Sequence, residues 1–235
     1  MKNLVIVFAL LATSSAQAQR PVDPSGHWKG TIEIPGNAMD FEIDVARNAR
    51  GEFYGTATGG SDRVTLPLQK IALDGTRLTF YARTDQPFQG EFSASGDMIS
   101  GTATLSGYTL SFGMSRTGDA NIEPRPTSLA VSKDLEGVWN GVLSAGGREF
   151  HFVLSIANQH DGTALAHQVN VDEGGLMLYL VVGQKGRHVT IEARSVAASY
   201  AGDLNAAGTE IAGTWTQGPT RLPLTLTRAT VEGQR

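Results

Sequence analysis

The chain carries the same segment twice, and this duplication limits its possible folds more than any other feature. The motif Gly-x-Trp-x-Gly begins at Gly26 and returns at Gly137. Beyond it, glycines and alternating apolar residues keep an offset of 111, which becomes 112 after one inserted residue near Tyr200. Matched positions include Phe41 and Phe152, Gly75 and Gly186, Gly96 and Gly208, and Leu110 and Leu222. Because self-similarity of this kind marks a repeated structural unit, both copies should share one fold.

Apolar and polar residues alternate with a period of two through both copies. Phe41, Ile43 and Val45, for example, alternate with Glu42 and Asp44. This period is typical of strands that bury one face. Glycine-containing turns separate the runs at the spacing of roughly 8–12 residues that indicates a sandwich or a barrel. In the first copy the predicted strands lie near 27–34, 39–47, 51–58, 64–72, 77–83, 87–93, 98–105 and 108–116.

An even number of strands with short connections favours closure of each sheet, because closure removes exposed strand edges. We therefore predict an all-β protein of two tandem small antiparallel up-and-down β-barrels, with about eight strands each. They occupy 22–118 and 134–230, and residues 119–133, with Pro124 and Pro126, form a linker that is extended at the prolines. A β-sandwich is the alternative. A membrane-spanning barrel is disfavoured, since its strands need about 9–11 residues and an apolar outer band.

The N-terminus has the pattern of a signal peptide. Lys2 supplies a positive charge, an apolar run covers residues 4–12, and Ala16-Gln17-Ala18 offers small residues for cleavage. The apolar run is well below the roughly 20 residues that a membrane-spanning helix needs. We expect residues 1–18 to be removed near Ala18 and the mature chain to be periplasmic or secreted.

The composition excludes several classes of function. The chain has no cysteine, so thiol catalysis and cysteine-ligated metal sites are ruled out. Its net charge of −4, spread without blocks, argues against binding to nucleic acid. Neither a metal-ligand spacing nor a Gly-x-Ser-x-Gly nucleophile motif is present. We predict no metal, no cofactor and no catalytic residue.

Each copy opens with a tryptophan on its first strand and closes its last strand with an arginine. These residues are Trp28 and Arg116 in the first copy, and Trp139 and Arg228 in the second. This resembles the calycin pattern of lipocalins, fatty-acid-binding proteins and avidins, in which a basic side chain from the last strand packs across the tryptophan. The resemblance implies a structural role in barrel closure for these four residues.

The chain also resembles a β-rich domain of secreted bacterial proteins that often precedes an α/β-hydrolase domain. The residues that carry this resemblance are Gly137-x-Trp139-x-Gly141, the run 213–218 and the run 222–228. In such proteins the catalytic apparatus belongs to the other domain. The resemblance therefore implies an accessory or binding role and transfers no catalytic residue.

Ligand-binding candidates are aromatic residues expected to be exposed near strand ends or in turns. They are Tyr54, Tyr108, Tyr200 and Trp215, with Gln217 as a polar neighbour. Ordinary packing at the mouth of a barrel is the competing interpretation. We predict an exported, non-catalytic binding protein for a small apolar molecule or an exported protein partner. The alternative is a stand-alone relative of the hydrolase-associated module, assisting substrate capture or envelope attachment.

Overall fold

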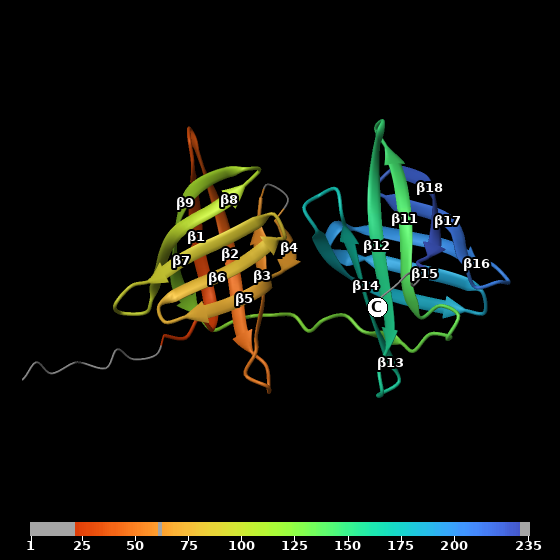
Figure 1. The fold of residues 1–235 in the computed structure, drawn as a ribbon, viewed down its shortest axis with the longest axis horizontal. Helices are drawn as coiled ribbons and strands as arrows, with labels where there is room; N and C mark the ends of the chain where they lie inside the picture. Colours follow the sequence, from red (N-terminus) through yellow and green to blue (C-terminus); the bar gives the residue numbers. More distant parts are fainter. Residues whose placement is uncertain (1–21, 61–62, 231–235) are drawn as a thin grey trace, which may run out of the picture.

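The computed structural model describes residues 22–60 and 63–230, and the predicted signal peptide lies outside them. The chain forms two tandem antiparallel β-barrels, as predicted (Figure 1). The strands of the first are β1 (Gly26–Ile34), β2 (Asn37–Arg47), β3 (Phe53–Gly59), β4 (Val64–Pro67), β5 (Gln69–Asp74), β6 (Arg77–Arg83), β7 (Gln86–Phe92), β8 (Met98–Leu105) and β9 (Tyr108–Gly118).

The second barrel repeats this order and adds one short strand and one turn of 3-10 helix. Its elements are β10 (Ser128–Leu129), β11 (Gly137–Ala145), β12 (Arg148–Asn158), β13 (Thr163–Asn170), β14 (Leu176–Lys185), β15 (His188–Ala193), η1 (Arg194–Val196), β16 (Ala198–Leu204), β17 (Glu210–Gln217) and β18 (Thr220–Arg228). The helical turn η1 falls where the sequence offset changes by one residue. The inserted residue therefore lengthens the β15–β16 connection.

In each barrel the first strand pairs with both the second and the last. Strand β1 lies between β2 and β9, and β11 lies between β12 and β18. The register places Trp28 opposite Arg116 and Trp139 opposite Arg228. The sheet thus curves far enough for the two ends of each repeat to become neighbours.

The two barrels differ in how they close. In the second, β13 pairs with β14, which completes a closed ring of strands. In the first, the single strand predicted at 64–72 is wrong, because the structure splits this segment into β4 and β5 on either side of Leu68. Pro67 has no N–H to donate to a sheet, and Lys70 has a φ of 50° beside a register shift. Strand β4 pairs with β3 and β5 pairs with β6, so the first barrel is nearly closed.

The interiors of the barrels also differ. The first is filled by phenylalanines, with Phe88 at the centre of a cluster that includes Phe41, Phe80 and Phe112. The ring centroid of Phe88 is 4.8 Å from that of Phe80. In the second barrel the positions of Phe80, Phe88 and Phe112 hold Ile191, Tyr200 and Leu224. The cluster of stacked phenylalanines is therefore not repeated at these positions of the second barrel.

Part of the predicted linker belongs to the second barrel. Ser128 and Leu129 form β10 and pair with the start of β13. The Ser128 hydroxyl accepts a hydrogen bond from the backbone N–H of Val182. Further back, the guanidinium of Arg125 lies 5.0 Å from the ring centroid of Tyr179 on β14. The linker thus covers part of the outer face of β13 and β14.

Candidate functional site

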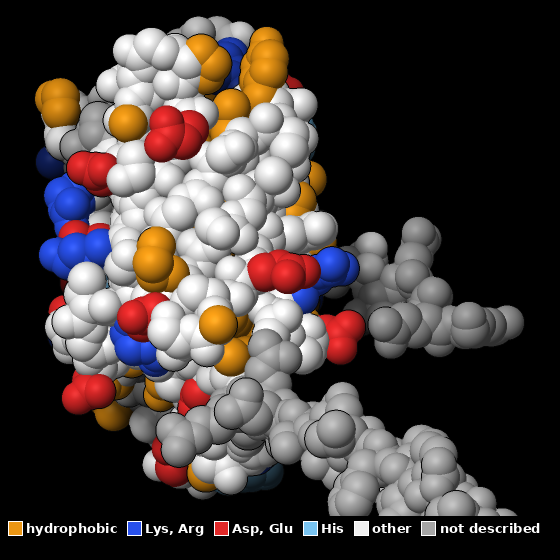
Figure 2. All heavy atoms as spheres, turned by 90° about the vertical axis from the view of Figure 1, so that its left-hand side faces the viewer, with side chains coloured by type: hydrophobic (Ala, Val, Ile, Leu, Met, Phe, Trp, Pro, Cys, Tyr) orange, Lys and Arg blue, Asp and Glu red, His pale blue; other side chains and the backbone are white. Residues whose placement is uncertain are grey.

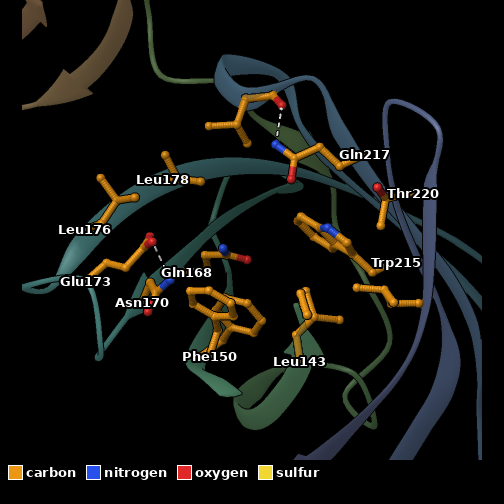
Figure 3. Close-up of a pocket in the computed structure, with 14 residues that line it drawn as sticks. Leu143, Phe150, Gln168, Asn170, Glu173, Leu176, Leu178, Trp215, Gln217 and Thr220 are labelled. Atoms are coloured by element: carbon orange, nitrogen blue, oxygen red, sulfur yellow. Dashed lines mark hydrogen bonds between the residues drawn. The ribbon is translucent and has the colours of Figure 1, made fainter. Parts of the chain in front are cut away.

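The second barrel contains a cavity of about 340 Å³ at the end where its β13–β14 loop lies (Figure 3). Strands β11 to β14, η1, β17 and β18 contribute to its wall. Its lining residues are Leu143, Ala145, Phe150, Phe152, Gln168, Asn170, Glu173, Leu176, Leu178, Val196, Trp215, Gln217, Thr220 and Leu222. The wall is mostly apolar with a few polar groups, and the volume lies within the roughly 300–1,000 Å³ of small-molecule sites.

Aromatic rings form one side of the cavity. The ring centroids of Phe152 and Trp215 are 6.3 Å apart with an interplanar angle of 24°. Phe150 also lines the cavity, across from Leu176 and Leu178 (Figure 3). Flat, rigid side chains of this kind contribute contact area without losing much rotamer freedom. This side of the cavity can therefore hold an aromatic ring or a folded alkyl chain.

The polar groups come mainly from the inward face of β13. Its buried positions are Ala164, Ala166, Gln168 and Asn170, so this face carries no large apolar side chain. The Gln168 side chain is only 8% exposed. No hydrogen bond to its amide is formed by any residue in 22–60 or 63–230, although both of its neighbours in the sheet are leucines. The Gln168 side chain faces the cavity (Figure 3). Its amide atoms are not fully enclosed by protein, so they can bond to water or to a ligand in the cavity.

The loop after β13 forms one rim of the cavity. Asp172 accepts hydrogen bonds from the backbone N–H of His151, at 2.6 Å, and from its ring Nδ1, at 2.8 Å. The backbone bond from His151 is the main cause that lowers the pKa of Asp172 below its ordinary value. Asn170 donates through Nδ2 to the carboxylate of Glu173 at 3.0 Å. These bonds place the Glu173 carboxylate at the cavity mouth.

The same loop contacts the first barrel. The carbonyl oxygen of Gly174 accepts hydrogen bonds from the backbone N–H of Thr84, at 2.8 Å, and from its hydroxyl, at 2.7 Å. Leu66 on β4 packs against the apolar core of the second barrel. The first barrel therefore borders the cavity mouth and holds one of its loops.

The opposite rim is built by the inserted residue in the β15–β16 connection. Ala197 has a φ of 50° and ends η1, whose Val196 lines the cavity. Gln217 donates through Nε2 to the carbonyl oxygen of Val196 at 3.0 Å. Its Oε1 is left to accept from a ligand. The one-residue difference between the repeats thus shapes the site in the second copy.

Two of the five ligand-binding candidates lie in the cavity. Trp215 and Gln217 line it together, although Trp215 is only 7% exposed, so the prediction that its ring is exposed is wrong. The expected exposure of Tyr200 is wrong: its ring is in the core, and its hydroxyl donates to the carbonyl oxygens of Ile211 and Leu224. Burial, the main cause, raises the pKa of Tyr200.

The other two candidates lie elsewhere. Tyr54 and Tyr108 are exposed on the first barrel, by 37% and 72%. Tyr108 sits at the position that Thr220 holds beside the cavity in the second copy. The structure therefore separates these two tyrosines from Trp215 and Gln217.

Sequence reasoning missed Gln168, Asn170 and Glu173. A signal was present, because Gln168 and Asn170 alternate with Leu165 and Val169, and the first copy has Ala57 and Gly59 at the two polar positions. Such a pattern does not by itself say which face is inward. The burial of Gln168 and Asn170 in the structure shows that this face is the inward one.

The tryptophan–arginine contacts are present at the other end of each barrel. The Arg116 guanidinium lies 4.4 Å from the Trp28 ring, and that of Arg228 lies 4.3 Å from the Trp139 ring. Arg116 also donates to the carbonyl of Ser25, and Arg228 donates to those of Glu136 and Asp134. Each arginine thus ties the last strand to the segment before the first. None of these four residues lines the cavity.

Other kinds of site have little support in the described part of the chain. Among those residues, no three histidine, aspartate or glutamate side chains could share a metal ion. Within the same ranges, none of the helical segments is long and apolar enough to cross a bilayer. On the side of the first barrel that looks away from the second, acidic and basic side chains are interspersed (Figure 2).

Comparison with known proteins gives no family for this chain. No family model matches it, and no curated protein matches it. Several solved structures resemble this chain, and they include the following two. One is a "putative outer membrane protein" of Bacteroides fragilis NCTC 9343, with 12% identity, coverage of 87% of this chain and 97% of that one, and a TM-score of 0.28. The other is a protein of unknown function from the DUF3598 family of Nostoc punctiforme PCC 73102, with 13% identity, coverage of 88% and 96%, and a TM-score of 0.25.

TM-scores this low carry no argument about function. The resemblances to calycins and to the hydrolase-associated module remain predictions.

Proposed function

We propose that this chain is an exported, non-catalytic binding protein whose second barrel takes up one small, largely apolar molecule. The observation that carries the proposal is the cavity of about 340 Å³ bounded by Trp215, Phe150 and Phe152. Its buried Gln168 amide has no protein partner within the described ranges. Apolar walls would supply affinity, and the few polar groups would orient the ligand. Export rests on the signal-peptide pattern of residues 1–18.

A neutral fluorescent probe, N-phenyl-1-naphthylamine, tests this proposal. Its fluorescence should rise on titration and saturate at one molecule per chain. Leu222→Trp, which places a larger ring at the cavity wall, should weaken binding about tenfold or more, the factor that ~1.4 kcal/mol represents.

Leu110→Trp is the matched control, because Leu110 occupies the equivalent position in the phenylalanine-filled barrel. It should leave the affinity unchanged, with circular dichroism used to verify that both variants are folded. Absence of saturable binding, or equal losses in the two variants, would contradict a ligand site in the second barrel.

A further inference from the structure

The chemistry of the cavity wall points beyond a generic apolar ligand. Resting on the function proposed above, we infer that the ligand is an uncharged molecule with an apolar body and a carboxamide-like head group, and that the site rejects carboxylates. The inference depends on three polar side chains, Gln168, Glu173 and Gln217, and on the absence of a basic residue among those that line the cavity in the described ranges.

Gln168 provides the head-group site. Its side chain is more than nine-tenths buried and offers one acceptor oxygen and two N–H donors. A carboxamide has the same set of groups, so it can donate to Oε1 and accept from Nε2 in one planar pair. A carboxylate could accept from Nε2 but would leave Oε1 facing another acceptor. The buried amide is therefore complementary to a group that both donates and accepts.

The electrostatics of the cavity disfavour an anion. Glu173 is the ionisable residue of the lining, and Asn170 fixes its carboxylate through a 3.0 Å hydrogen bond. Gln217, which uses one N–H of Nε2 for the carbonyl oxygen of Val196, keeps a neutral amide with a free acceptor oxygen and supplies no positive charge. A carboxylate ligand would lose its hydration, meet no cation and approach a like charge. Arg148 lies outside, with its guanidinium 5.1 Å from the Phe150 ring centroid.

A nearly isosteric pair of probes separates the two cases. Calorimetric titration at neutral pH compares 2-naphthamide with 2-naphthoate, which differ mainly in the charge and donor capacity of the head group. We expect 2-naphthamide to bind about tenfold more tightly or better. Gln168→Leu should reduce this preference by weakening the binding of 2-naphthamide, while the affinity for N-phenyl-1-naphthylamine is kept.

Glu173→Gln tests the electrostatic part. It should narrow the ratio of the two affinities by strengthening binding of 2-naphthoate. Glu149→Gln is the matched control, because Glu149 is exposed on β12 and does not line the cavity. It should leave the ratio unchanged. Arg148→Gln should likewise leave 2-naphthoate no weaker, since the inference gives this arginine no part in binding.

The outcomes distinguish this inference from the proposed function. Equal or tighter binding of 2-naphthoate overturns the preference for an uncharged head group and leaves the apolar site in place. Binding of N-phenyl-1-naphthylamine without binding of 2-naphthamide also overturns it. If no probe binds, the ligand site itself is disproved.

Discussion

The two barrels share one fold but use their interiors differently. In the first, Phe88 packs among three other phenylalanines. In the second, Tyr200 takes the equivalent position and turns its hydroxyl to backbone carbonyls, while Gln168 and Asn170 replace Ala57 and Gly59. The comparison shows that two copies of one barrel can have different interiors, with an aromatic cluster in the first and a cavity with polar groups in its wall in the second. At these positions the copies differ by a few side-chain exchanges and one inserted residue.

The largest expected effect is on the packed barrel. Phe88→Ala removes a ring that is 4% exposed and contacts several others, so the free energy of unfolding of the first barrel should fall by about 3–5 kcal/mol. Hydrogen-exchange mass spectrometry, which reports the two barrels separately, should show lost protection in β1–β9. An equal loss in β11–β18 would mean that the barrels unfold as one unit and would break the comparison.

Exchanging the matched residues should give a smaller effect in both directions. Tyr200→Phe removes the hydroxyl that donates to Ile211 and Leu224 and should cost about 1–2 kcal/mol. Phe88→Tyr puts a hydroxyl among phenyl rings and should cost about 1–3 kcal/mol. Urea unfolding followed by circular dichroism measures both. If either variant were as stable as the wild type, the two interiors would be interchangeable at this position.

Replacing a polar residue of the cavity wall with an apolar one should change stability still less. Gln168→Leu replaces an amide that faces the cavity and has no protein partner in the described ranges with an apolar side chain of similar size, so the free energy of unfolding should stay equal or rise by about 1 kcal/mol. Gln89→Leu, at an exposed position on β7, is the control and should leave stability unchanged. The measurement is the same urea unfolding. A loss of more than about 1 kcal/mol in Gln168→Leu would show that this amide serves packing rather than ligand binding.

The smallest effect concerns pH and the rim of the cavity. Because the pKa of Asp172 is lowered in the folded chain, its bonds to His151 stabilise the loop above the ordinary aspartate pKa and are lost as the pH falls below it. Amide protection factors in residues 171–176 should therefore drop under acidic conditions. Asp172→Asn should weaken protection at neutral pH and remove most of this dependence. An unchanged profile in the variant would show that another group controls the loop.

The sequence by itself determined the duplication, the all-β class and most strand positions, because alternation and glycine turns are local signals that both copies repeat. Local signals did not predict that the segment 64–72 splits into β4 and β5. The effect of Pro67 on strand pairing depends on which strands lie beside it in the fold. Local signals also failed at Tyr200, because its buried hydroxyl donates to carbonyl oxygens on two other strands, β17 and β18.

Only the tertiary structure decided that the polar face of β13 turns inward and that the second barrel is the open one. The alternation of Gln168 and Asn170 with Leu165 and Val169 fits either orientation of the strand. The choice depends on contacts with other strands, which pair with β13 on both sides in the folded chain. Burial and cavity volume are sums over many strands, so no single segment of the chain encodes them.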